Sequence, residues 1–597
     1  MKRSLITFFA VLCFAGGGND PNLSPYTLAA SADGSKIYIA CATANKVLVF
    51  DTAARKITGS IAVPATPTGL ALSPDGARLY VTCAAPASTI AIVDTVSRKP
   101  AGTLPAGHTA MGPAISPDGR TLYVCNRFDN DVAAIDLAAK KEIYRAKVLR
   151  EPIAEALTPD GKLLFVANQL PVGRADGDFV AAAVTVLEAA TGKTVKQIAL
   201  PNGSSSLEGI ALSPDGKFAA VTHILGHINL PPTQLERGWM NTNALSIIDV
   251  AQVKLLNTVL LDNVDSGAAN PWAVSWSKDG SRICVTHAGT DEVSVLDAPG
   301  LIAKLKKSAS PGDVPNDLSF LLGLQQRIKL DGKGPRGLAL VKSTAYVSNY
   351  FSDSLSVVDL ASSEAAPVSI ALGTPQEPSM ERRGESLFHD ATIAFQGWQS
   401  CSSCHPDGRS DAMHWDLLND GIGNPKNTKS MLYSHRTPPA MSQGVRESAE
   451  IAVRSGLEHI LFASRPESEA EAIDEYLKSL RPVPSPYLVN GEPTAAALRG
   501  KKLFYDPQVG CASCHGGELF TDLQSYDVGT GGPNDKSQAF DTPTLIENWR
   551  TAPYLHDGRA ASMFEVLRKD NPHDKHGKTS RLTDRQLKDL AEFVLSL

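Results

Sequence analysis

The sequence predicts a multidomain protein in which an all-β, seven-bladed propeller is followed by a mainly α-helical region made of two duplicated lobes. Seven similar units of short strands fill the first part of the chain. The apolar alternation typical of β-strands stops after Leu372, and the helical part that follows repeats its own local sequence once. We expect the propeller at residues 25–372, a linker at 373–380, and the lobes at 381–490 and 491–597.

An apolar strand ending in an acidic residue marks each of the seven N-terminal units, and an Asp-Gly turn recurs in six of them. Asp75-Gly76 and Asp118-Gly119 are two of these turns, and Val47 to Asp51 is one of the strands. Four short strands per unit are typical of a propeller blade, which buries its faces only against neighbouring blades. The alternative, a β-solenoid, requires shorter units.

Two of the repeated strands share a short motif, Tyr123-Val124-Cys125-Asn126 and Tyr346-Val347-Ser348-Asn349. On these motifs, residues 25–372 resemble the YVTN family of seven-bladed propellers. His223 and His287 end the corresponding strands of two other units. We interpret them as hydrogen-bonded strand-end residues, with metal binding as the alternative.

The helical region contains two C-x-x-C-H motifs, C-S-S-C-H at 401–405 and C-A-S-C-H at 511–515. In this pattern two cysteines on one helical turn form thioethers with a haem, and the following histidine binds the iron. A zinc site requires a second ligand pair for each motif, and a redox Cys-x-x-Cys requires no histidine. The sequence therefore predicts two covalently attached haem c groups. The predicted attachment and iron-binding residues are Cys401, Cys404 and His405, and Cys511, Cys514 and His515.

The helical region is itself a duplication. Arg383-Gly384 precedes the first motif as Arg499-Gly500 precedes the second, and each is followed by Leu-Phe. Thr542-Pro543-Thr544-Leu545 then leads to the segment A-P-Y-L-H-D-G-R at 552–559. On these motifs, residues 378–597 resemble the bacterial di-haem cytochrome c peroxidase and MauG family. The resemblance implies an oxidoreductase that passes electrons between two haems to hydrogen peroxide or to a bound redox partner protein.

The same resemblance implies a calcium ion between the lobes, at positions that match Asn427, Thr551 and Pro553. Oxygen ligands of this kind suit a hard cation. The sequence departs from the family at Ser442, where the peroxidases have a tryptophan between the haems, and their distal Gln and Glu do not align. Glu458 is the nearest acid and hence the candidate catalytic residue.

The function depends on the sixth ligand of each iron, because a fully coordinated haem moves electrons whereas an open one activates a ligand. The candidates for the first haem are Met413, His414, His435, Met441 and His459. For the second haem they are His573 and His576, of which we prefer His576. If both irons are six-coordinate, the protein is a pure electron-transfer cytochrome whose propeller docks the partner. A third alternative is a non-redox cell-surface binding protein or haem sensor.

The longest loop insertions leave the fifth and sixth units, at Leu225 to Thr242 and Leu301 to Lys333. Long loops on a rigid scaffold often carry binding residues. Trp239-Met240 makes the first loop a candidate for docking the haem region, and a loop without such a role is the alternative.

Composition and the N-terminus narrow the class further. A formal charge of −6 and a pI near 6.1 exclude the basic surface that a nucleic-acid-binding protein needs. Residues 1–18 resemble a secretory signal peptide, with Met1-Lys2-Arg3 before a short apolar core, and Cys13 leaves a lipoprotein as the alternative. No run approaches the roughly 20 apolar residues of a transmembrane span. We therefore expect a bacterial periplasmic or extracellular protein.

Overall fold

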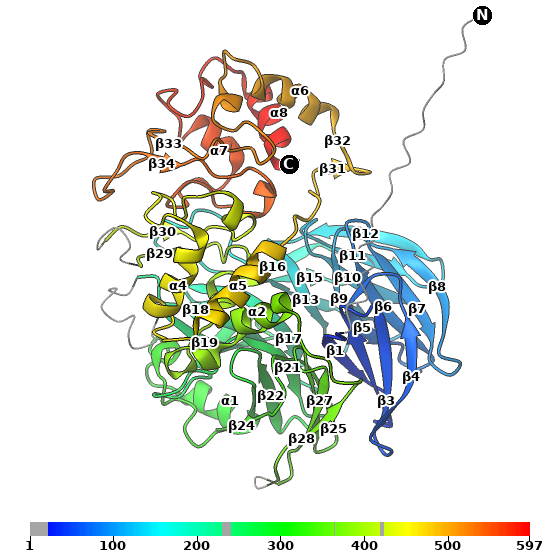
Figure 1. The fold of residues 1–597 in the computed structure, drawn as a ribbon. Coiled ribbons are helices and arrows are strands. Elements are labelled where there is room, and N and C mark those ends of the chain that lie inside the picture. Colours follow the sequence, from blue (N-terminus) through cyan, green and yellow to red (C-terminus); the bar gives the residue numbers. More distant parts are fainter. Residues whose placement is uncertain (1–21, 230–239, 363–364, 418–422) are drawn as a thin grey trace, which may run out of the picture.

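The structure is a computed structural model that describes residues 22–229, 240–362, 365–417 and 423–597 (Figure 1). The predicted signal peptide and Trp239 lie outside the described residues. Within these ranges, no helix is both long and apolar enough to cross a membrane.

Seven four-stranded antiparallel sheets follow one another along the described part of the propeller, and each has its strands in chain order. The first four blades comprise β1 (Pro25–Ala30), β2 (Lys36–Cys41), β3 (Lys46–Asp51), β4 (Lys56–Ala62); β5 (Thr66–Leu72), β6 (Arg78–Ala84), β7 (Thr89–Asp94), β8 (Lys99–Pro105); β9 (Ala110–Ile115), β10 (Thr121–Asn126), β11 (Asp131–Asp136), β12 (Lys141–Lys147); and β13 (Pro152–Leu157), β14 (Leu163–Asn168), β15 (Ala183–Glu188), β16 (Thr194–Ala199). The last three comprise β17 (Ser204–Leu212), β18 (Phe218–Gly226), β19 (Asn241–Asp249), β20 (Lys254–Leu260); β21 (Pro271–Trp276), β22 (Arg282–His287), β23 (Glu292–Asp297), β24 (Gln325–Lys329); and β25 (Pro335–Val341), β26 (Thr344–Asn349), β27 (Ser354–Asp359), β28 (Val368–Ala371).

The blades close into a ring, because the first strand of each blade contacts that of the next and β25 contacts β1. The Asp353 carboxylate ties the two ends together by accepting hydrogen bonds from the backbone N–H groups of Leu23 (2.9 Å) and Ser24 (2.8 Å). Leu23 and Leu28 pack in one apolar cluster with Leu355 of the seventh blade. The predicted seven-bladed propeller is confirmed.

The repeated turn sequence has a local physical reason. In the fifth blade, the Asp215 carboxylate accepts hydrogen bonds from the Ser213 hydroxyl (2.7 Å) and the Lys217 N–H (3.1 Å). Gly216 follows with φ +69°, a left-handed conformation that glycine adopts without strain. The Ser/Thr-Pro-Asp-Gly repeats therefore encode the same closed turn from blade to blade.

The helical region stands on one side of the propeller (Figure 1). The helices of the first lobe are α2 (Met380–His389), α3 (Cys401–Cys404), α4 (Ala449–His459) and α5 (Glu467–Ser479), and those of the second are α6 (Ala495–Phe504), α7 (Met563–Arg568) and α8 (Asp584–Leu595). The propeller insertion contributes α1 (Ala298–Lys307). The short 3₁₀ turns are η2 (Val314–Asn316), η3 (Ala391–Ile393), η4 (Phe395–Gly397), η5 (Pro406–Gly408), η6 (Ser434–Arg436), η7 (Cys511–Ser513) and η8 (Asn548–Arg550), and two-residue strands run from β29 (His414–Trp415) to β34 (Phe540–Asp541).

The same helix crossing builds both lobes: α2 packs on α5, and α6 packs on α8. At the crossings, a Cβ on Gly384 would lie 1.8 Å from the Ala472 carbonyl oxygen, and one on Gly500 would lie 1.9 Å from that of Asp589. Only glycine permits so close an approach of two helix backbones. The paired Arg-Gly segments thus have a packing reason, and the predicted pair of duplicated lobes is confirmed.

Candidate haem sites and their junction with the propeller

The first haem motif forms the short helix α3, with Cys401 and Cys404 one turn apart and His405 directly after it. The Nδ1 atom of His405 lies 2.9 Å from the Arg409 carbonyl oxygen. A carbonyl only accepts hydrogen bonds, so Nδ1 carries the proton and Nε2 keeps the lone pair that binds a metal. The residues therefore fit a haem iron on the Nε2 side of His405.

The second motif repeats this arrangement on η7. The Nδ1 atom of His515 lies 3.1 Å from the Phe520 carbonyl oxygen, which selects the same tautomer. The ring centroid of His576 lies 6.2 Å from that of His515. When two imidazole nitrogens bind one metal from opposite sides, each at about 2 Å, the centroids of the two rings are separated by roughly the distance observed here. His573, by contrast, is exposed.

Asn571 organises the loop that carries His576, a role that the sequence did not reveal. Its side chain accepts the His576 N–H (2.9 Å) and donates to the carbonyls of His576 (3.0 Å) and Gly577 (2.8 Å). Asn571 is 4% exposed, so these bonds are shielded from water. The only sequence signal was an asparagine before a proline, which is typical of a turn.

The candidates for the distal side of the first haem are spread over the lobe. His435 Nε2 lies 2.9 Å from Asp474 Oδ1, and both side chains are buried. Burial opposes ionisation of Asp474, but hydrogen bonds from His435 and Arg454 hold the pKa of its carboxyl below the usual value. Glu458 and His459 lie exposed at the end of α4, with their side chains 75% and 61% exposed.

The two methionine candidates differ in surroundings. Met441 is half-buried, whereas Met413 is 1% exposed and packs in the apolar cluster beside Cys404. His414 is buried, and its Nδ1 has no hydrogen-bond partner among the described residues. In the described part of the chain, no ring faces His405 as His576 faces His515. The surroundings of the two candidate haem sites thus differ among the described residues.

Asp407, two residues after His405, joins the first lobe to the propeller and to the second lobe. Its Oδ2 lies 2.7 Å from Arg127 Nη2 of the propeller and 2.6 Å from Arg550 Nη2 of the second lobe. Arg127 also pairs with Glu151 at 2.9 Å. Burial opposes ionisation, but the two arginines hold the pKa of the Asp407 carboxyl well below its usual range. The propeller and both lobes therefore meet at Asp407, two residues after His405.

Arg409 continues this junction. Its carbonyl accepts the His405 proton, while its guanidinium forms a two-pronged ion pair with Glu547 at 3.0 and 2.9 Å. Both side chains are at most 5% exposed. Because Arg409 holds His405 through its carbonyl and the second lobe through its guanidinium, the two lobes are joined next to the first motif.

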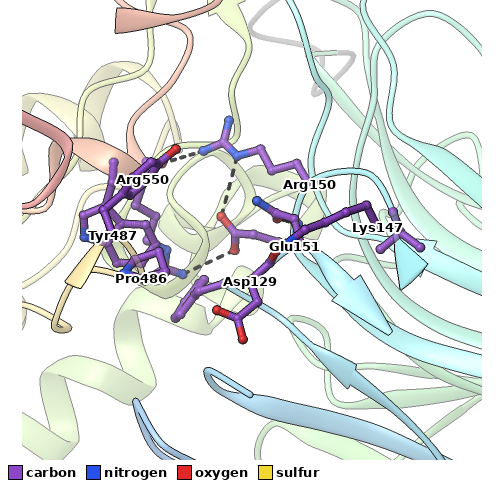
Figure 2. A pocket seen from close by; sticks show the side chains of 11 residues that line it. Asp129, Lys147, Arg150, Glu151, Pro486, Tyr487 and Arg550 are labelled. Atoms are coloured by element: carbon purple, nitrogen blue, oxygen red, sulfur yellow. Dashed lines mark hydrogen bonds and ion pairs between the residues drawn. The ribbon is translucent and has the colours of Figure 1, made fainter. Parts of the chain in front are cut away.

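Next to the junction lies a cavity of about 360 Å³ between the propeller and the second lobe (Figure 2). The Arg150 guanidinium crosses it to the carbonyls of Arg550 and Ala552. Trp549 packs against Phe128 of the propeller with ring centroids 5.0 Å apart. None of these contacts was expected from the sequence, because they join loops far apart in the chain. The lining residues are Phe128, Asp129, Asn130, Lys147, Val148, Arg150, Glu151, Pro486, Tyr487, Trp549 and Arg550.

Two of the three candidate calcium ligands come together between the lobes. Asn427 Nδ2 lies 2.5 Å from the Pro553 carbonyl oxygen, and Asn427 Oδ1 is buried without a partner among the described residues. The third candidate is the backbone carbonyl of Thr551, whose hydroxyl donates to the Asn548 carbonyl oxygen at 3.0 Å. The unpartnered Asn427 Oδ1 is an oxygen group of the kind that a hard cation prefers, although the Asn427 atom that contacts the Pro553 carbonyl is the amide nitrogen.

The strand-end histidines of the propeller are fully buried and hydrogen-bonded. His223 Nε2 lies 2.8 Å from Ser246 Oγ, and His287 Nε2 lies 2.7 Å from Ser294 Oγ. Burial lowers the pKa of His223 to about 4 and that of His287 to about 3. This geometry agrees with their interpretation as hydrogen-bonded core residues.

A seven-bladed propeller joined to two lobes that each present C-x-x-C-H beside a helix crossing defines a c-type cytochrome fused to a propeller. Residues 497–597 match the Cytochrome c family. The chain is 31% identical over 279 residues to hydrazine synthase subunit gamma of Kuenenia stuttgartiensis, an alignment that covers 38% of this chain and 79% of the relative. It is 24% identical over 296 residues to the methylamine utilization protein MauG of Methylorubrum extorquens, covering 37% and 79%. The chain belongs to the family of this gamma subunit.

A second subunit of the same enzyme also matches. Hydrazine synthase subunit beta of Kuenenia stuttgartiensis is 29% identical over 185 residues, covering 30% of this chain and 46% of the relative. A solved structure titled Kuenenia stuttgartiensis Hydrazine Synthase aligns with a TM-score of 0.53 and 27% identity over 57% of this chain and 96% of that one. An alignment of that length exceeds the helical region, so it includes propeller blades.

Proposed function

We propose that the protein is a di-haem c-type oxidoreductase with unequal haem sites. The observation that carries the proposal is the contrast between His515, which faces His576 at 6.2 Å between ring centroids, and His405, which no described ring faces. When bound, two haems supply one-electron storage and, at an iron with a free face, a place for a small oxygen or nitrogen compound. The second site therefore suits electron transfer, and the first suits chemistry.

The protein's own residues support this division. His405 and His515 each donate Nδ1–H to a backbone carbonyl, so both present Nε2 to a metal. At the second motif Ser513 is exposed, whereas Ser403 of the first motif is 3% exposed. The greater exposure of Ser513 favours the second site as the one that a redox partner protein reaches from solvent.

Hydrogen peroxide is the first substrate to test, because MauG and a cytochrome-c peroxidase of Pseudomonas are among the relatives. Glu458 lies 75% exposed at the end of α4, so we assign it no part in this reaction. The experiment is low-temperature EPR of the oxidised and half-reduced protein with and without peroxide. A high-spin signal that disappears with stoichiometric peroxide supports the proposal. Two low-spin haems indifferent to peroxide overturn it and leave a pure electron-transfer cytochrome.

Chemistry on a small nitrogen compound is the second candidate. It is favoured by one observation: both the gamma and the beta subunit of hydrazine synthase match parts of this single chain. The chain would then combine in one polypeptide what that enzyme divides between two. Titration with hydrazine separates the candidates, because reduction of the haems, or a spectral change confined to the first one, supports nitrogen chemistry, and no spectral change opposes it.

We further propose that the protein is exported to the bacterial periplasm or cell exterior and binds one calcium ion between its lobes. Covalent haem at two motifs and the signal-like N-terminus support export. The Asn427 Oδ1, which is buried without a partner among the described residues, and the Pro553 carbonyl oxygen, which the Asn427 amide nitrogen contacts, support the calcium site. Cell fractionation tests the first statement, and metal analysis of the purified protein tests the second.

A further inference from the structure

Three asparagines at the ends of propeller strands contact the segment that carries the first haem motif. They are Asn241 and Asn243 of β19 and Asn270, the residue before β21. All three are at most 8% exposed. The C-x-x-C-H motif does not include these asparagines, which belong to the propeller.

Asn270 binds both residues between the haem-binding cysteines. Its Nδ2 donates to Ser400 Oγ at 2.8 Å and to Ser402 Oγ at 3.3 Å, and its Oδ1 accepts the Ser403 hydroxyl at 2.7 Å. The buried side-chain amide of Asn270 thus both donates hydrogen bonds to α3 and its preceding residue and accepts one from α3. Because α3 has only four residues, its own backbone bonds are too few to fix its position.

Asn241 and Asn243 hold the two sides of the same turn. Asn241 Nδ2 lies 2.9 Å from Gln399 Oε1 and 3.5 Å from the Cys404 sulfur. Asn243 Nδ2 lies 3.1 Å from the Trp398 carbonyl oxygen, and Asn243 Oδ1 accepts the Asn270 N–H at 3.0 Å. Asn243 and Asn270 are therefore directly connected, and Asn241 binds the same segment independently.

Apolar propeller residues complete the contact. Val180, Ile228 and Met240 pack with Met413 and Trp415 in the cluster beside Cys404. A Cβ on Gly267 of the propeller would lie 2.4 Å from the Trp398 Cα, so the two backbones touch. The loop that the sequence singled out for docking is thus confirmed at Met240.

Among the described residues, no propeller asparagine forms hydrogen bonds of this kind with the second motif. Ser513 is exposed, and its hydroxyl donates to Gly510 of the same lobe at 2.5 Å. Contact between the propeller and the second lobe falls elsewhere, for example at Ala175 and Gly558, whose N–H and carbonyl groups are 2.9 Å apart. The propeller therefore discriminates between the two haem sites.

We propose that the propeller forms one wall of the first haem site and that Asn270 and Asn241 are positioning residues for that haem. The inference rests on the proposed attachment of haem at residues 401–405. By fixing α3, the asparagines fix the two sulfurs and His405, and hence the geometry and polarity around the iron. The propeller thereby sets the reduction potential of one haem without touching the other.

The test is spectroelectrochemical titration of both haems in Asn270→Ala, with EPR to assign each signal. A net hydrogen bond is worth about 0.5–1.5 kcal/mol, so we expect the reduction equilibrium of the first haem to change about two- to tenfold, and that of the second to stay unchanged. Asn349→Ala is the matched control, because Asn349 is a fully buried strand-end asparagine that bonds only to Ser354 and Ser356 of its own blade.

A double-mutant cycle with Ser403→Ala separates positioning from general destabilisation. Ser403 also caps α3, but the cycle cancels that contribution and leaves the Asn270–Ser403 coupling. Potential shifts that fail to add support the inference. An unchanged first-haem potential in Asn270→Ala, or an equal shift in Asn349→Ala, overturns it. Mass analysis of the peptide containing residues 401–405 comes first: absence of haem there overturns the proposed function together with this inference, whereas haem present with an unchanged potential overturns this inference alone.

Discussion

The imidazole rings of His515 and His576 face each other with their centroids 6.2 Å apart and their planes inclined at 40°. His515 ends the second haem motif, and His576 comes from a loop that Asn571 holds by three backbone contacts. The gap leaves room for one metal atom between two nitrogens. The distance between the rings is therefore compatible with the proposal that His576 binds the same iron as His515.

Replacing His576 removes one axial ligand and tests this site directly. In His576→Ala we expect one haem to change from low-spin to high-spin, because the iron loses its sixth ligand, while the other haem keeps its spectrum. Visible absorption and EPR of the oxidised protein measure the change. His573→Ala is the control, since His573 is exposed three residues away. A low-spin second haem in His576→Ala would show that another residue binds the iron.

The ion pair of Arg409 with Glu547 should be important for stability. Removing one partner of a buried pair leaves an uncompensated charge and costs about 3–5 kcal/mol. We therefore expect Glu547→Gln to lower the free energy of unfolding of the haem region by that amount in denaturant titrations. The control is Glu475→Gln, whose pair with Lys478 is more than 40% exposed on both sides and is worth about 0–1 kcal/mol. Equal effects of the two variants would contradict the importance of burial.

The architecture was predictable because its signals are local. The first six blades each contain a turn in which an aspartate such as Asp215 accepts hydrogen bonds from its own turn and a glycine such as Gly216 supplies a positive φ. Each lobe has a glycine, Gly384 or Gly500, where its two helices cross. These residue types are required by neighbours a few positions away or by a contact that repeats along the chain. They therefore form patterns that can be recognised in a single sequence.

The arrangement of the sites was less predictable, because it depends on polar residues that look like ordinary turn residues. Nothing local distinguishes Asn270, which binds the first haem motif, from Asn349, which does not. His573 and His576 share one polar loop, and only the bonds made by Asn571 decide which of them turns inward. Long-range pairing of loops leaves no periodic signal in the chain.

Removal of calcium should affect the contact between the lobes. If Asn427 and the Pro553 carbonyl bind the ion, a chelator should lower the thermal-unfolding midpoint of the wild-type haem region, because binding stabilises only the folded state. Asn427→Ala should begin at the lower midpoint and be insensitive to the chelator. Asn424→Ala, three residues away, serves as the control, and metal analysis should give one calcium in it and none in Asn427→Ala. Chelator sensitivity that persists in Asn427→Ala would place the ion elsewhere.

The turn aspartates make the stability of the propeller depend on pH on the acid side. Hydrogen bonds from the serine or threonine two residues earlier lower the pKa of Asp33, Asp160, Asp215 and Asp279 to about 2. Since the folded pKa lies below the unfolded value near 3.8, their stabilisation is complete above that value and is lost as the pH falls through about 2. Far-UV circular dichroism in denaturant should therefore show the unfolding midpoint falling between about pH 4 and about pH 2.

A single turn then tests the cause. Ser213→Ala removes the hydroxyl that donates to Asp215 at 2.7 Å, so it should flatten the acid-side dependence. Ser343→Ala changes an exposed turn serine of the seventh blade that is not followed by Asp-Gly, and the dependence should stay as in the wild type. Both variants lose one serine hydroxyl, so an equal flattening would trace the acid sensitivity to something other than the capped aspartates. A difference confined to Ser213→Ala would mean that the repeated motif, besides shaping each turn, holds its carboxylate ionised in acid.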